Sequence, residues 1–206
     1  MPEARQRIGI LGGTFNPIHH AHLFSAEVAA AAHGLHQVLL VPASQSPLKA
    51  RACVSTPDRV AMARLAAAEN PLLEVSTVDV DRPPPSYTAQ TIALLAERYR
   101  GAALYLILGM DALQDFLEWR DPERVLDLCR VIAVSRSGYD LAVPPAIAAR
   151  LGERTARIVL QPMPCLEISS TDIRRRLRAG EPVRYLIPES VERYIRHRGL
   201  YASSEE

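Results

Sequence analysis

The sequence has few cysteines, few aromatic residues, almost no net charge and no long apolar run. Its 206 residues include three cysteines, a single tryptophan and 5% aromatic residues. Cys53, Cys129 and Cys165 are widely spaced and form no C-x-x-C pair. They indicate neither a disulfide framework nor a zinc ribbon, and are typical of buried thiols in a reducing cytosol.

Charge and hydropathy exclude two further classes of protein. Because 24 Lys+Arg oppose 23 Asp+Glu, the net charge is only +1, which gives no electrostatic footprint for a nucleic-acid backbone. The apolar run after "MPEARQR" is too short for a signal-peptide core, and no later stretch approaches a membrane-spanning length. We therefore expect a cytoplasmic protein whose partners are small molecules, neither nucleic acid nor membrane. Homo-oligomers are compatible with the sequence, which leaves the oligomeric state open.

The hydrophobic content of 48% is enough for one large core, so we expect a single domain over 1–206 that ends in a short tail. Runs rich in Val, Ile and Leu predict buried strands; they are "RIGIL", "QVLLVP", "LLEVSTV", "ALYLIL", "RVIAVS" and "ARIVL". Stretches with helical spacing lie between and after them, at 20–33, 57–69, 88–100, 111–128, 144–150, 170–179 and 188–198. This alternation predicts an α/β fold, a Rossmann-like doubly wound parallel sheet with helices on both faces and the C-terminal helices packed on the edge.

Local signals mark several helix ends. Gly34, Gly101 and Gly180 stand where a glycine commonly ends a helix, and Thr88 is a candidate N-cap. The helix of "TPDRVAMARLAAAE" begins with Thr56, a proline and an early aspartate. These signals support the predicted alternation.

The stretch "GGTFNPIHHAH", residues 12–22, follows the first predicted strand. In such a sheet the turn after the first strand commonly binds phosphate. Gly12 and Gly13 would let the main chain approach a ligand, and a helix beginning near His20 would direct free N–H groups at an anion. His19 and His22 are three residues apart and would share one helix face, well placed to hydrogen-bond a phosphate.

Other interpretations of this stretch remain open on the residues alone. The glycines could only form a turn, since "GGTFN" is neither G-x-G-x-x-G nor a Walker sequence. Three histidines within four residues could ligate zinc, although no H-E-x-x-H pattern, cysteine or carboxylate lies beside them. The histidine pair could also be merely structural.

A second segment, "EISSTDIRRRLRAG" at 167–180, predicts a helix capped by Ser169 or Ser170 with Asp172 in its first turn. Arginines follow early in this helix, where the helix dipole disfavours cations by about 0.3–1 kcal/mol each at exposed sites. An anion bound at this end would offset that cost. A solvated basic face is the alternative.

Both segments resemble motifs of the nucleotidyltransferase superfamily, whose members join a nucleoside monophosphate to a phosphorylated acceptor. Residues 12–22 are similar to its G-x-F-x-P-x-H-x-G-H motif, with Ala21 in place of the glycine that precedes the last histidine. "SSTDIR" is similar to its late S-[ST]-[ST]-x-I-R motif, which caps the ATP triphosphate. The resemblance implies an ATP site; its members are Gly12, Gly13, Thr14, Phe15, His19, His22, Ser170, Thr171 and Arg174.

Nearly the whole chain resembles the nicotinate-nucleotide adenylyltransferase branch of that superfamily, which serves bacterial NAD synthesis. "VPASQSPLKAR" is similar to its P-x-x-x-P-x-K loop, with Lys49 as a phosphate-neutralising cation and Leu48 in place of a common histidine. "PSYTAQTI" and "FLEWRDPERVL" imply that Tyr87, Thr88 and Trp119 bind the pyridine nucleotide. "ILGMDAL" and "VSRSGYD" add Gly109, Asp111 and Arg136 on the ATP side.

The resemblance implies that the 5′-phosphate of nicotinate mononucleotide attacks the α-phosphorus of ATP, releasing pyrophosphate. His19, His22, Lys49 and Arg174 would then be the catalytic residues, with Mg²⁺ carried by ATP and no protein metal site. Two alternatives stay open at this point. One is a relative with another acceptor, nicotinamide mononucleotide or phosphopantetheine, and the other is a nucleotide-binding regulator without turnover.

Overall fold

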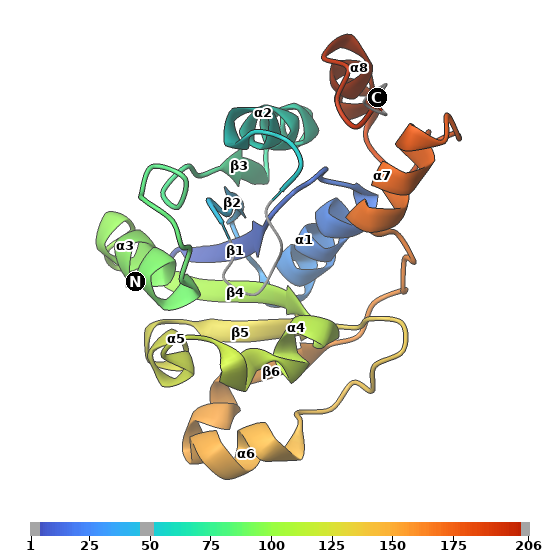
Figure 1. Ribbon diagram of the computed structural model, residues 1–206. Coiled ribbons are helices and arrows are strands. Elements are labelled where there is room, and N and C mark those ends of the chain that lie inside the picture. The colour runs from blue at the N-terminus through green and yellow to red at the C-terminus, as the bar shows by residue number, and fades with distance from the viewer. Residues whose placement is uncertain (1–4, 46–51, 203–206) are drawn as a thin grey trace.

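The computed structural model describes residues 5–45 and 52–202. The strands that it describes are β1 (Arg7–Gly13), β2 (Gln37–Pro42), β3 (Leu73–Val75), β4 (Ala103–Gly109), β5 (Arg130–Val134) and β6 (Ile158–Gln161). They form one parallel sheet in the order β3-β2-β1-β4-β5-β6, which runs through the middle of the molecule (Figure 1). The predicted α/β, doubly wound class is confirmed.

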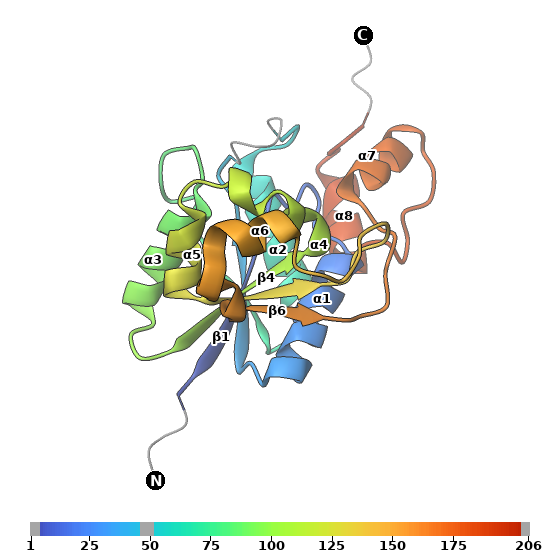
Figure 2. The same ribbon diagram turned by 90° about the horizontal axis from the view of Figure 1, so that it is seen from below.

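Helices connect the strands and follow the last of them. Their bounds are α1 (His20–His33), α2 (Thr56–Ala67), α3 (Thr88–Arg98), α4 (Met110–Gln114), α5 (Pro122–Leu128), α6 (Pro145–Leu151), α7 (Ser170–Arg178) and α8 (Glu189–His197), with 3₁₀ turns η1 (Phe116–Glu118) and η2 (Gly152–Arg157). Figure 2 shows α7 and α8 on the side of the molecule opposite α3 and α5. Among the described residues, no helix is long and apolar enough to cross a membrane.

Two hydrophobic clusters cover the two faces of the sheet. Because side chains alternate along a strand, Ile8 and Ile10 of β1 enter one cluster and Leu11 enters the other. The first cluster also contains buried residues of α3, α4, α5 and α6, and the second contains residues of α1, α2, α7 and α8. The near-continuous apolar strands thus reflect burial on both faces.

One predicted helix is wrong as a continuous element. The stretch 111–128 forms α4, η1 and α5, separated by Asp115 and by residues 119–121. Pro122 lacks the N–H that an incoming helix would need, so it stands at the start of α5, after Asp121 in the left-handed region at φ 55°. Apolar residues recur with helical spacing on both sides of this break, so the spacing alone predicted one continuous helix.

Smaller corrections concern caps and bounds. The N-cap of α3 is Tyr87, so Thr88 is its first residue. The third strand ends at Val75 instead of spanning 72–78, because residues 77–81 fold into a turn closed by the Asp81 N–H on the Thr77 carbonyl. Strand β1 continues through Gly12 and Gly13, which pair with Val41 and Pro42, so the turn begins only at Thr14.

The predicted glycine ends of helices are present. Gly34 caps α1 at φ 60°, and Gly101 and Gly180 have φ of 88° and 67°, where side-chain residues are strained.

Candidate active site

The candidate site begins in the loop that joins β1 to α1, at the carboxyl end of a central strand. Phe15 and Ile18 are 1% and 0% exposed and anchor this loop in the core. Only the backbone of Phe15 can therefore face a nucleotide. A Cβ on Gly13 would lie 2.8 Å from the Phe15 ring, so this packing requires glycine. A Cβ on Gly12 would meet nothing within 4 Å among the described residues, which leaves the main chain accessible there.

The predicted histidine pair is brought together at the start of α1. The rings of His19 and His22 stack with centroids 3.6 Å apart and an interplanar angle of 24°. The backbone N–H of His19 donates to Nδ1 of His22 at 3.3 Å. Because Nδ1 is the acceptor, a neutral His22 carries its proton on Nε2, which makes that atom a hydrogen-bond donor.

His19 is the more buried of the two rings. It is 3% exposed, and its Nδ1 has no hydrogen-bond partner within residues 5–45 and 52–202. Burial, followed by the positive charge of Arg136 and then of His20, lowers the pKa of His19 to about 3. The ring is therefore neutral near pH 7.

The second predicted segment contacts the first directly. Helix α7 begins with Ser169 as its N-cap, whose Oγ accepts the Asp172 N–H at 3.1 Å. Ser170 Oγ donates to the Pro17 carbonyl at 2.8 Å. Arg174 donates from Nη1 to the Asn16 carbonyl at 2.8 Å and from Nη2 to Thr171 Oγ1 at 3.1 Å. The two motifs, some 150 residues apart in the chain, therefore form one structural unit.

Gly109, Asp111 and Arg136 gather beside this unit at the ends of β4 and β5. Gly109 is the N-cap of α4, and a Cβ on it would lie 2.3 Å from Asp111 Oδ1 and 4.0 Å from Arg136 Cδ. Arg136 is also close enough to lower the pKa of His19. These three residues thus lie together on the side predicted for ATP.

Two predicted acceptor residues lie on segments that contact each other. The guanidinium of Arg120 lies over the Tyr87 ring, with Cζ 4.6 Å from its centroid. Trp119 precedes Arg120, and its ring packs on Phe116 with centroids 5.2 Å apart. Thr88 follows Tyr87 as the first residue of α3. Lys49 and Leu48 lie outside the described residues.

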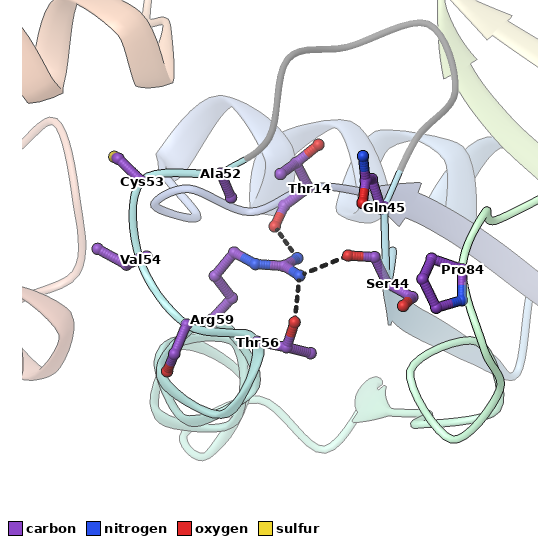
Figure 3. A pocket seen from close by; sticks show the side chains of 10 residues that line it. Thr14, Ser44, Gln45, Ala52, Cys53, Val54, Thr56, Arg59 and Pro84 are labelled. Carbon is purple, nitrogen blue, oxygen red and sulfur yellow. Dashed lines mark hydrogen bonds between the residues drawn. The ribbon is translucent and has the colours of Figure 1, made fainter.

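A cavity of about 370 Å³ lies between the first loop, the end of β2 and the start of α2 (Figure 3). Its lining includes Thr14, Ser44, Gln45, Cys53, Thr56 and Arg59. Thr14 belongs to the predicted ATP loop, whereas Ser44 and Gln45 belong to the predicted acceptor segment. The cavity therefore borders both predicted subsites.

Sequence reasoning missed three buried polar residues around this cavity. Arg59 and Asp79 are 1% and 3% exposed, and Tyr201 is 7% exposed. Tyr201 donates its hydroxyl to Asn16 Oδ1 at 2.7 Å, which ties the C-terminal segment to the first loop. None of the three stands in a recognisable motif. For Arg59 and Asp79 the only sequence signal was a charged residue near apolar positions, which is also typical of ordinary protein surfaces.

Comparisons with known proteins show the family of the chain. Residues 10–176 match the cytidylyltransferase-like family. A probable nicotinate-nucleotide adenylyltransferase of Roseiflexus sp. (strain RS-1) is 48% identical over 94% of this chain and 97% of its own length. A probable nicotinate-nucleotide adenylyltransferase of Saccharopolyspora erythraea is 43% identical over 98% of this chain and 92% of its own length.

Solved structures support the fold. The Plasmodium falciparum nicotinic acid mononucleotide adenylyltransferase complexed with NaAD aligns with a TM-score of 0.77 and 19% identity, covering 96% of this chain and 98% of that one. The same enzyme complexed with APC aligns with a TM-score of 0.75 and 18% identity, and the alignment again covers 96% of this chain and 98% of that one. With the identities above 40% over nearly the full length, the chain belongs to the cytidylyltransferase-like family and, within it, to the nicotinate-nucleotide adenylyltransferases.

Proposed function

We propose that the chain transfers the adenylyl group of ATP to nicotinate mononucleotide, forming nicotinate adenine dinucleotide and pyrophosphate in cytoplasmic NAD biosynthesis. The observation that carries this proposal is the contact between the stacked histidines' loop and α7, through Arg174 on the Asn16 carbonyl at 2.8 Å. That contact brings the loop that precedes the stacked imidazoles against the helix that carries the Arg174 guanidinium. Such groups together suit a polyphosphate.

The reaction is an in-line displacement at phosphorus. A 5′-phosphate oxygen of the acceptor forms a bond to the α-phosphorus, and the bond from that phosphorus to the bridging oxygen breaks. The electron pair leaves with pyrophosphate. Because the attacking oxygen is already charged at neutral pH, the protein needs no nucleophile, and catalysis consists of positioning and of stabilising charge.

His22 and His19 donate hydrogen bonds to the α-phosphate and bridging oxygens. His22 does so from Nε2, since its Nδ1 is held by the His19 N–H. His19 is buried and neutral when no nucleotide is bound. A neutral imidazole carries one N–H group, so the ring can donate one hydrogen bond. Thr171 and Arg174 contact the β and γ phosphates, with Gly109, Asp111 and Arg136 on the adenosine side.

On the acceptor side, Tyr87, Thr88 and Trp119 bind the pyridine nucleotide, and Lys49 neutralises its phosphate. The contact of Arg120 with Tyr87 supports this grouping because it joins the two segments that carry the aromatic residues. No cluster of three or more metal-ligating His, Cys, Asp or Glu side chains occurs in the described part of the chain. In this proposal Mg²⁺ enters as part of the MgATP substrate, where it neutralises phosphate charge.

Pyrophosphate release measured with ATP and each of three acceptors tests the proposal. Nicotinate mononucleotide should give the highest kcat/KM. A higher kcat/KM for nicotinamide mononucleotide or phosphopantetheine would show that the protein is an adenylyltransferase with another acceptor. ATP binding without pyrophosphate release from any of them would show a nucleotide-binding regulator.

A further inference from the structure

Ser44 is held by buried charges on both sides of its peptide backbone. Its N–H donates to Asp79 Oδ2 at 3.0 Å, and its carbonyl accepts from Arg59 Nη2 at 3.0 Å. The carboxylate is 3% exposed and the guanidinium 1%. Ser44 itself lines the cavity beside the candidate site (Figure 3). Two buried charges thus fix one residue of the cavity wall.

Arg59 lines the same cavity but has no terminal donor left for a ligand. Nη1 donates to the Thr14 and Ala43 carbonyls, both at 2.7 Å. Nη2 donates to the Ser44 carbonyl at 3.0 Å and to Thr56 Oγ1 at 2.9 Å. A guanidinium has four N–H groups on its terminal nitrogens, so all four are used. Arg59 therefore acts through the backbone of two segments, the loop after β1 and the end of β2.

Asp79 organises only the second of these segments. Besides Ser44, it accepts hydrogen bonds from Thr91 Oγ1 at 2.6 Å, Arg82 Nη2 at 2.5 Å and Ser86 Oγ. Ser86 pairs in turn with Gln45, donating its N–H to the Gln45 carbonyl at 2.8 Å and accepting the Gln45 N–H on Oγ at 3.2 Å. Ser86 immediately precedes Tyr87, so this network joins the two segments proposed to bind the acceptor.

We propose that Asp79 and Arg59 are positioning residues: Asp79 orders the acceptor-binding wall through Ser44 and Ser86, and Arg59 couples that wall to the ATP loop through Ser44 and Thr14. This inference rests on the proposed function and assigns the two residues different kinetic effects. Among the described residues Asp79 makes no hydrogen bond to the ATP loop, whereas Arg59 contacts both sides.

The experiment is steady-state kinetics of Asp79→Asn, Arg59→Lys and Arg59→Met with ATP and nicotinate mononucleotide. Asp79→Asn should raise the KM for nicotinate mononucleotide about tenfold and change the KM for ATP less than twofold. That tenfold change corresponds to the loss of one buried hydrogen bond to a charged group. Arg59→Met should raise both KM values and lower kcat at least about tenfold. Arg59→Lys, which keeps the charge and three donors, should recover part of the loss.

A milder variant and a matched control make the result decisive. Ser86→Ala removes one donor to Asp79 and should raise the same acceptor KM by a smaller factor, even if Asp79→Asn fails to fold. Ile147→Ala removes a buried side chain of α6, outside the network, and should lower the urea midpoint while leaving both KM values unchanged.

The outcomes separate the two proposals. Wild-type protein without activity toward nicotinate mononucleotide would overturn the proposed function. Active wild-type protein, with Asp79→Asn and Ser86→Ala variants that lose stability like Ile147→Ala but keep the wild-type acceptor KM, would overturn the positioning roles and leave the function intact. Equal rises in both KM values for Asp79→Asn would also contradict its assignment to the acceptor side.

Discussion

At the scale of single residues, the stacked imidazoles have the most specific role in the proposed function. His22 has its Nδ1 occupied by a backbone N–H, and so directs a donor from Nε2. We expect His22→Ala to lower kcat at least about a hundredfold, a typical loss for one donor to developing charge. Pyrophosphate release measures the rate, and far-UV circular dichroism should remain unchanged. Near-wild-type turnover would remove the catalytic assignment.

The burial of His19 predicts a pH dependence of stability. Its pKa falls from 6.5 to about 3 on folding, so the unfolded chain binds a proton that the folded chain excludes. The contribution of this residue to the free energy of unfolding should therefore be constant above pH 6.5. The free energy of unfolding should decrease as the pH falls below 6.5, because the unfolded chain then gains a proton. The slope of this contribution is at most about 1.4 kcal/mol per pH unit.

Urea unfolding at pH 7, 6 and 5 measures this slope. His19→Gln removes the titrating group, so its unfolding free energy should depend less on pH in this range than that of the wild type. His197→Gln, on the exposed end of α8, is the matched control and should keep the wild-type slope. Identical slopes for the wild type and His19→Gln would show that the folded protein does protonate this ring.

The predictability of the site follows from whether a residue stands in a motif. His19, His22, Ser170 and Arg174 share a local pattern that could be recognised before any fold was known, and the structure brings their segments into contact. Arg59, Asp79 and Tyr201 could not be recognised, because each has a partner far away in the chain: Thr14 is 45 positions from Arg59, Ser44 is 35 from Asp79, and Asn16 is 185 from Tyr201. Such contacts exist only after the chain has folded.

At the scale of elements, apolar runs and local caps were sufficient to predict the alternation of strands and helices. They were insufficient where two signals conflicted. Apolar spacing over 111–128 indicated one helix, whereas Pro122 and the left-handed Asp121 divide it. The break carries Trp119 and Arg120, so Trp119 lies between two helical segments instead of on a helix face, and its neighbour Arg120 contacts Tyr87.

Helix α7 has a stability contribution that one residue can test. Ser169 caps it by accepting the Asp172 N–H at 3.1 Å. We expect Ser169→Ala to lower the free energy of unfolding by about 1 kcal/mol, because that N–H loses its partner at the helix start. Ser169→Asn supplies another capping side chain and should remain near the wild type. Urea unfolding measures both, and equal losses in the two variants would contradict a capping role.

At the scale of the whole molecule, the sheet positions the candidate site. Strands β1 and β4 are adjacent and parallel, so their carboxyl ends lie at the same edge of the sheet. Helix α7 and the segment that follows α8 complete this edge from a distant part of the chain, through the Ser170, Arg174 and Tyr201 contacts with residues 16–17. A ligand bound there would therefore contact segments from both ends of the chain.

This arrangement predicts a large shift in the unfolding temperature when ATP binds. A ligand that binds only the folded state adds about 2.7 kcal/mol at roughly 100 times its Kd. For a chain of about this length, each kcal/mol raises Tm by roughly 2–4 °C, so MgATP at that excess should raise it by roughly 5–10 °C. Differential scanning fluorimetry over a range of MgATP concentrations measures the shift.

The variant Arg174→Ala provides the comparison for that shift. Because it removes both the proposed phosphate contact and the bond to the Asn16 carbonyl, its Tm without ligand should fall and its response to MgATP should shrink. Nicotinate mononucleotide alone should still raise its Tm, since the proposed acceptor residues lie on other segments. An undiminished response to MgATP would place the triphosphate away from α7 and would contradict the shared site on which the proposed adenylyl transfer depends.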